Sequence, residues 1–230
     1  MKAIEPAPDI HLGGEEHIGV IGQSRSGKTT FVRDIVLSWF LNTPGFGRVW
    51  AIDTEERGEF PESDGWKVMP FDSITPNNVE LIKILNDGNI KFKWVTPFST
   101  DTKGLEKNEL LCAMILKYGT NIAIYYDEIS DFCNTHWIGE QHTQLMRKSG
   151  KREINIIWSS QRIQMVHKDI FSQTHHLFVF FIKPGEANSQ AVKQAAPFIS
   201  ENLAQIPYQS YRALYQGPSG KVVIVTSSRK

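Results

Sequence analysis

The chain alternates short apolar runs, rich in β-branched residues, with longer segments in which apolar residues recur at helical spacing. This alternation predicts strands that are each followed by a helix. The predicted strands cover residues 17–21, 48–53, 91–95, 122–127, 154–159 and 177–183. The predicted helices lie near residues 28–41, 76–85, 105–118, 139–148 and 186–196.

The predicted strands are apolar along their whole length, as in Ile-Ala-Ile-Tyr-Tyr over residues 122–126. A strand of this kind is buried on both faces, which a sheet between two layers of helices requires. We therefore expect a three-layer α/β fold with a mostly parallel central sheet. A last pair of strands, 211–215 and 222–226, flanks a Gly-Pro-Ser-Gly turn and predicts a C-terminal β-hairpin.

The length of 230 residues fits a single domain over 1–230, with an N-terminal arm at 1–14 and the hairpin and tail at 206–230. Hydrophobic residues make up 40% and the 25 basic and 25 acidic residues cancel, which argues against a protein that coats nucleic acid. The apolar runs are too short to cross a bilayer. Two cysteines and no signal peptide favour a soluble protein in a reducing, cytoplasmic compartment.

Between the first strand and the first helix the sequence reads Gly-Gln-Ser-Arg-Ser-Gly-Lys-Thr-Thr. In this spacing, known as Walker A, the glycines let the backbone curl so that its amides converge on phosphates at the helix N-terminus. Lys28 then reaches the β- and γ-phosphates of ATP, and the Thr29 hydroxyl binds Mg²⁺. The alternative is a glycine-rich turn without a ligand. The expected nucleotide-binding residues are Gly22, Gln23, Ser24, Arg25, Ser26, Gly27, Lys28, Thr29 and Thr30.

The apolar run at 122–126 ends in Asp127 and Glu128. A carboxylate at this point reaches the carboxyl edge of a parallel sheet, where the predicted phosphate loop also lies. We expect Asp127 to hold Mg²⁺ and Glu128 to polarise the attacking water, the pattern called Walker B. The alternative is a strand that ends in acids only to keep its tip soluble.

The strand at 154–159 leads into Gln161, an amide that can report the state of the γ-phosphate or only cap the strand. A basic turn that includes Arg147 and Arg152 precedes this strand. Such a turn is a solvated loop, a DNA contact, or the source of an arginine finger that stabilises charge on a neighbouring subunit's γ-phosphate.

Taken in this order, these features resemble the FtsK–HerA superfamily of DNA-pumping ATPases, over most of the chain from His17 onward. Ser159-Ser160-Gln161-Arg162 and the closing hairpin carry the specificity of the resemblance. The resemblance implies a RecA-like core, a homo-oligomeric ring that is commonly a hexamer, and ATP-driven translocation of double-stranded DNA. Family members often carry Gly-Arg before the sensor strand, whereas this chain has Gly150-Lys151-Arg152, so both Arg147 and Arg152 remain candidate fingers.

The chain has no room for the membrane helices, DNA-reading domains or N-terminal barrels of larger members. A bare core is most similar to the genome-packaging ATPases of tailless double-stranded DNA viruses. That similarity implies capsid or portal-vertex proteins as partners, and the host cytoplasm or the virion packaging vertex as the location.

Other readings stay open. A cellular DNA-translocating or helicase-associated ATPase would share the same features. A nucleotide or small-molecule kinase also uses this phosphate loop, but would be expected to carry an arginine-rich lid. A nucleotide-gated scaffold without catalysis would not need Lys28, Thr29, Asp127 and Glu128 together.

Overall fold

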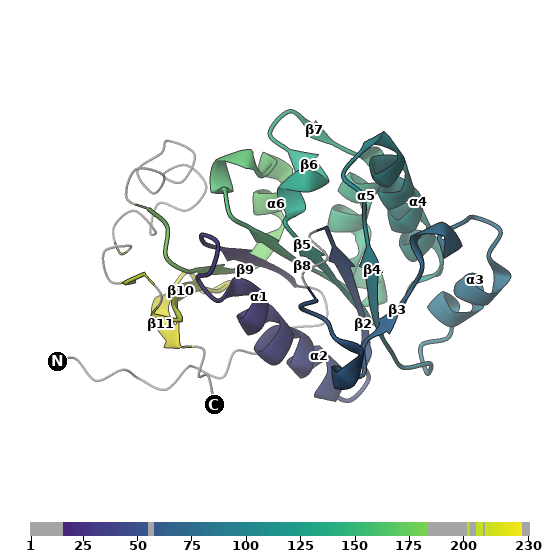
Figure 1. The fold of residues 1–230 in the computed structure, drawn as a ribbon, viewed down its shortest axis with the longest axis horizontal. Coiled ribbons are helices and arrows are strands. Elements are labelled where there is room, and N and C mark those ends of the chain that lie inside the picture. The colour runs from purple at the N-terminus through teal and green to yellow at the C-terminus, as the bar shows by residue number, and fades with distance from the viewer. Residues whose placement is uncertain (1–15, 55–57, 184–201, 203–205, 209, 227–230) are drawn as a thin grey trace.

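A nine-stranded sheet, seven of whose strands run parallel, forms the centre of the molecule (Figure 1). The computed structural model describes residues 16–54, 58–183, 202, 206–208 and 210–226. The predicted N-terminal arm at 1–14 and the predicted helix at 186–196 lie outside the described residues.

The strand order is β11-β10-β9-β1-β8-β5-β2-β4-β3. The strands from β9 to β3 are parallel, and β10 and β11 add an antiparallel hairpin at the β9 edge. The bounds are β1 His17–Ile21, β2 Arg48–Asp53, β3 Lys67–Val68, β4 Phe92–Pro97, β5 Ile122–Asp127, β8 Ile154–Ser160, β9 Thr174–Val179, β10 Arg212–Gln216 and β11 Val222–Thr226. A separate small hairpin pairs β6 Cys133–Asn134 with β7 Trp137–Ile138. The mostly parallel α/β sheet and the C-terminal hairpin are confirmed.

Helices cover both faces of the sheet. One face packs against α1 (Lys28–Phe31) and α2 (Ser38–Asn42), which a π-helical segment, Val32–Leu37, joins into one rod. The other face packs against α3 (Val79–Asn86), α4 (Thr102–Tyr118), α5 (Glu140–Lys148) and α6 (Lys168–Ser172). Alternate residues of each buried strand enter one core or the other, as in β2, where Trp50 faces one cluster and Ala51 the other.

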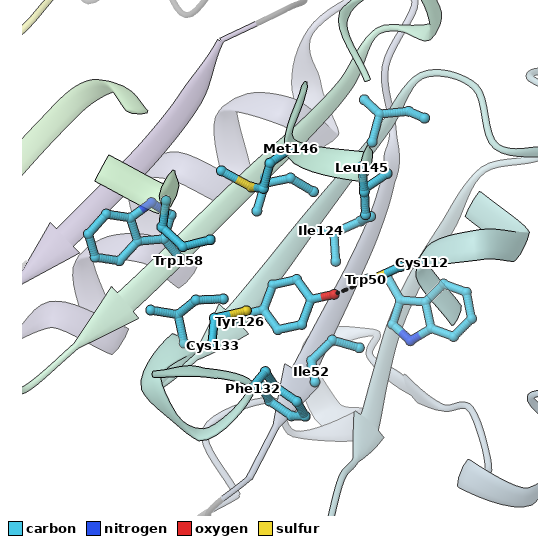
Figure 2. Close-up of a cluster of buried hydrophobic side chains, with 14 of the residues drawn as sticks. Trp50, Ile52, Cys112, Ile124, Tyr126, Phe132, Cys133, Leu145, Met146 and Trp158 are labelled. Carbon is cyan, nitrogen blue, oxygen red and sulfur yellow. Dashed lines mark hydrogen bonds between the residues drawn. The ribbon is translucent and has the colours of Figure 1, made fainter. Parts of the chain in front are cut away.

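Figure 2 shows the larger core, between the sheet and helices α4 and α5. Tyr126 lies at its centre, with Cys112 from α4 and Cys133 beside it. The Tyr126 hydroxyl donates to Asn108 Oδ1 at 3.0 Å, so its polar atom is satisfied inside the apolar cluster. Both cysteines are buried and free, and burial raises the pKa of the Cys112 thiol to about 12. They behave as packing residues.

Several element bounds differ from the sequence prediction. Helix α3, predicted to begin at residue 76, begins at Val79, because Asn78 caps it by accepting the amide of Leu81 at 3.0 Å. Helix α4 begins three residues earlier than predicted, because Asp101 caps it by accepting the amide of Gly104 at 2.8 Å. The strand predicted at 177–183 is wrong at both ends, since β9 pairs with β1 only over Thr174–Val179.

Among the described residues, no helix combines the length and the apolar character that crossing a membrane requires.

Candidate nucleotide-binding and catalytic site

The predicted phosphate loop lies at the carboxyl edge of the sheet, between the ends of β8 and β9. The amide of Gly22 donates to Ser160 O at 3.1 Å, and the amide of Gln23 donates to Phe181 O at 3.0 Å. The loop is thus fixed to both strands that flank β1. Gly27 has a φ of 96°, in the left-handed region where a side chain is strained, and its added Cβ would lie 2.7 Å from the Tyr211 ring. Glycine is therefore required here for conformation and for space.

Lys28 lies in the first turn of α1 and is 7% exposed. Its Nζ donates to Gln23 O at 3.1 Å, which folds the side chain back across the mouth of the loop. In this position the ammonium group faces the ring of backbone that phosphates would enter. The structure therefore places Lys28 where the sequence predicted it.

Tyr125 links the two residues predicted to bind Mg²⁺. Its hydroxyl donates to Asp127 Oδ1 at 2.7 Å, and the Thr29 side chain lies close enough to the same hydroxyl to affect the pKa of Tyr125. Ser159 Oγ donates to the same Asp127 oxygen at 3.0 Å. Burial, and then the nearby Asp127 charge, raise the pKa of Tyr125 well above its usual value of 10, so its hydroxyl keeps its proton. Tyr125 was missed by the sequence analysis, because in sequence it is one more apolar residue of a buried strand.

The donor set here fits a hard divalent cation. The carboxylate of Asp127 is 8% exposed, and no described residue donates a hydrogen bond to its Oδ2. The Thr29 hydroxyl and this carboxylate oxygen are oxygen ligands of the kind that Mg²⁺ takes together with water and phosphate. The β2–β5 register also places Asp53 directly beside Asp127, so a second carboxylate lies at the same edge.

Both carboxylate oxygens of Glu128 accept hydrogen bonds. Oε1 accepts the hydroxyls of Ser130 at 2.5 Å and Ser160 at 2.6 Å, and Oε2 accepts the amide of Gln161 at 2.8 Å. Glu128 has a φ of 74°, uncommon for a residue with a side chain, where the chain leaves β5. The strained backbone and the three donors hold its carboxylate against the tip of β8. Ser160 was not predicted; its signal is a polar residue at the end of a buried strand.

Asp131 lies near the carboxylates of Asp127 and Glu128. Burial raises its pKa, with a further contribution from the charges of Glu128 and Asp127. The site therefore concentrates negative charge that a cation would offset.

Gln161 follows β8 directly and lines a cavity that also touches Gln23 and Arg25 of the loop. The structure thus brings together the loop, Asp127, Glu128 and Gln161. Gln161 holds Glu128 through its backbone amide and forms part of the cavity wall.

The two candidate finger arginines lie at the opposite, amino edge of the sheet. Arg147 Nη2 donates to Asp169 Oδ2 at 2.9 Å, and Arg152 Nη1 donates to Lys117 O at 2.9 Å. Arg152 O accepts the amide of Asn121, which precedes β5. Neither arginine reaches the phosphate loop of its own chain, and both bond to groups at the amino edge.

Solved structures share this fold. The genome packaging NTPase B204 from Sulfolobus turreted icosahedral virus 2, in complex with ATP-gammaS, aligns with a TM-score of 0.70 and 14% identity over 93% of this chain and 98% of that one. B204 from Sulfolobus turreted icosahedral virus, a DNA-packaging ATPase, aligns with a TM-score of 0.65 and 16% identity over 95% of this chain and 100% of that one. VirB4 of Thermoanaerobacter pseudethanolicus aligns with a TM-score of 0.65 and 9% identity over 93% of this chain and 90% of that one.

No family model and no curated protein matches the sequence. At these identities the likeness establishes the fold. It confirms the RecA-like P-loop NTPase core that the resemblance to the FtsK–HerA superfamily implied, with the closing hairpin included.

Proposed function

We propose that this protein is an Mg²⁺-dependent ATPase that works as a ring motor on double-stranded DNA. The observation that carries the proposal is the 2.7 Å hydrogen bond from Tyr125 to Asp127, a link that holds the carboxylate at the sheet edge where the phosphate loop and Thr29 also lie. A buried tyrosine that orients a carboxylate toward the end of a phosphate loop serves no purpose in a ligand-free turn. The link favours an Mg·ATP site over a glycine-rich turn.

The chemistry follows from the chain's own groups. The loop amides and Lys28 bind the β- and γ-phosphates, and Thr29 with Asp127 holds Mg²⁺, which neutralises charge that develops on the phosphates. Glu128 takes a proton from a water whose oxygen attacks the γ-phosphorus. The bond from that phosphorus to the bridging oxygen breaks, and ADP and orthophosphate result. Among the described residues, Oε2 of Glu128 accepts a single hydrogen bond, so this oxygen has a lone pair for the attacking water.

The finer proposal concerns the work that hydrolysis drives. We infer genome packaging into a preformed capsid, because the solved structures of similar fold include packaging NTPases of two viruses and the chain covers almost their whole length. On this proposal the partners are DNA, further copies of the chain in a ring, most simply a hexamer, and capsid or portal-vertex proteins. The place of action is the host cytoplasm or the packaging vertex.

Two substitutions test the site. Lys28→Ala should lose most nucleotide binding, because the terminal phosphates lose their cationic partner. Glu128→Gln should retain Mg·ATP and hydrolyse it slower by orders of magnitude, because the amide cannot take a proton. Binding of a fluorescent ATP analogue and release of phosphate measure the two effects separately. A folded Lys28→Ala protein with normal turnover would refute the assignment of the loop.

A further inference from the structure

A cavity of about 760 Å³ lies on the outer side of the phosphate loop, at the carboxyl edge of the sheet. Its walls come from three segments: the loop itself, the residues after β8, and the residues after β9 with Tyr208. The residues that matter here are Gln23, Arg25, Gln161, Arg162, Lys183 and Tyr208. The loop residues in this wall belong to the predicted nucleotide site, whereas Arg162, Lys183 and Tyr208 have no role in the site described above.

The cavity lies toward the face of the sheet opposite α1. Ile163, next to Arg162, is buried in the core on the α3–α6 face, and Phe181 in the cavity wall packs against that same core. In contrast, Phe31 and Val32 of the rod begun by α1 belong to the core of the other face. The cavity and the rod begun by α1 therefore lie toward opposite faces of the sheet, and the phosphate loop lies between them.

Three cations line the cavity without a counter-charge. In the described part of the chain, Arg25, Arg162 and Lys183 are exposed and have neither an ion pair nor a side-chain hydrogen bond. Like charges gathered in one hollow repel one another, and an anion relieves that repulsion. The chemistry of the walls therefore selects an anion.

Gln161 connects this cavity to the reaction. Gln161 lines the cavity, and its backbone amide donates to Glu128 Oε2 at 2.8 Å. On the other wall, the Gln23 amide donates to Phe181 O, so the loop and the end of β9 move as one unit. The cavity thus begins where the terminal phosphate would be cleaved.

We propose that this cavity is the exit site for orthophosphate, the product cleaved from ATP. The inference rests on the proposed ATPase function. ADP still fills the loop after cleavage, so the free phosphate dianion leaves past Gln161, toward the cations Arg162 and Lys183. Liquid water occupies about 30 Å³ per molecule, so a cavity of this size admits the anion with its hydration shell. Binding there is weak and exchange is fast.

The test uses inorganic phosphate as the probe and needs no hydrolysis. ³¹P line broadening of phosphate is measured on the full chain with Mg·ADP and on Lys28→Ala without nucleotide, and both should show binding. The double variant Arg162→Gln/Lys183→Gln should bind phosphate at least about fivefold more weakly, because two of three cations are removed. The matched control is Lys221→Gln, an exposed lysine in the β10–β11 turn, near the amino edge. It should leave phosphate binding unchanged.

The exit role itself is tested by comparing two rates: the rate of ATP cleavage, measured by quench-flow, and the rate of phosphate release, measured by stopped-flow. The double variant should cleave ATP in the first turnover as the wild type does, and release phosphate several-fold more slowly. Unchanged phosphate affinity in the double variant, or binding that disappears in Lys28→Ala alone, would overturn the proposal. So would a double variant that binds phosphate normally and loses affinity for DNA. A protein that binds phosphate through Arg162 and Lys183 but hydrolyses no ATP would refute the proposed function and support the anion site.

Discussion

Ser160 donates its hydroxyl to Glu128 Oε1 at 2.6 Å, and the carbonyl of the same serine accepts the amide of Gly22 at 3.1 Å. One fully buried residue therefore fixes the position of the proposed general base relative to the first residue of the phosphate loop. The two contacts meet in a single residue, one through its side chain and the other through its backbone carbonyl.

Ser160→Ala should lower kcat by roughly ten- to a hundredfold, because a hydrogen bond to a charged group contributes about 1.5–3 kcal/mol. The KM for ATP should change little, since the loop keeps its bond to the Ser160 carbonyl. Steady-state kinetics separate the two parameters. Ser172→Ala, a change on the exposed α6 hydroxyl that bonds Asp169 O, serves as the control. A rise in KM with unchanged kcat would show that Ser160 supports only the loop.

Tyr125→Phe should raise the Mg²⁺ concentration that half-saturates ATP turnover by about fivefold or more. The substitution removes the hydroxyl that orients Asp127 and contacts Thr29, while the ring remains in the core. Tyr126→Phe is the matched control on the same strand, because that hydroxyl points to Asn108 on the opposite face. It should cost about 1 kcal/mol of stability and leave the Mg²⁺ requirement as it was. Equal Mg²⁺ requirements in both variants would contradict the assigned role of Tyr125.

Most of the scaffold could be predicted from the sequence. Apolar β-branched runs identified β1, β2, β5 and β11 with their observed bounds. The first three are buried on both faces and are therefore apolar along their whole length. The edge strand β11 is only partly buried, and the Gly-Pro-Ser-Gly turn before it indicated where it begins. The end of β9 could not be found in this way: beyond Val179 the apolar residues continue, yet the backbone turns to bond the phosphate loop at Gln23. Hydrophobicity indicates that a residue is buried, but it does not show whether that residue continues a strand or leaves it to contact the phosphate loop.

The residues of the candidate site also fall into two groups, those that the sequence could predict and those that it could not. Lys28, Asp127 and Glu128 stand in a spacing that has a chemical meaning, so sequence was sufficient to propose them. Ser160 contacts Glu128 from a strand distant in sequence, and Tyr125 contacts Ser159 of that strand as well as Asp127 of its own, so no local pattern marks their roles. They became visible only when β5 and β8 were placed side by side.

The stability of the fold should decrease as the pH falls below neutrality. Burial lowers the pKa of His17 from 6.5 to about 4. Its Nδ1 accepts the amide of Ile156 at 3.0 Å, so the ring has no room for a second proton. Between pH 6.5 and 4 the unfolded chain binds more protons than the folded one, and stability is lost as the pH falls through that window.

From pH 7.5 to pH 5 this single histidine should cost about 2 kcal/mol of unfolding free energy. His142, with a pKa lowered to about 3 by burial, adds to the effect in the same direction. Urea unfolding at the two pH values measures the loss. His17→Gln should reduce it, whereas His136→Gln, at an exposed position, should not. An unchanged loss in His17→Gln would contradict this origin of the pH dependence.

Arg147→Ala or Arg152→Ala should abolish turnover and spare nucleotide affinity if one of them completes a neighbouring site. An arginine finger contributes about three to five orders of magnitude in phosphoryl transfer. Mixing inactive Glu128→Gln subunits with inactive finger-variant subunits should then restore activity, since some interfaces combine an intact base with an intact finger. If each arginine variant is as active as the wild type, the basic turn is a DNA contact or a solvated loop. A smaller salt dependence of DNA binding would identify the DNA contact.

The central claim is that this fold couples ATP hydrolysis to double-stranded DNA. The most direct measurement is the steady-state rate of phosphate release by the full chain with Mg·ATP, at increasing protein concentration, with and without linear double-stranded DNA. The account predicts turnover per subunit that rises as rings form, rises again on adding DNA, and disappears in Lys28→Ala. Turnover that ignores DNA and needs a small phosphate acceptor, or no turnover by a folded protein that binds ATP, would contradict it.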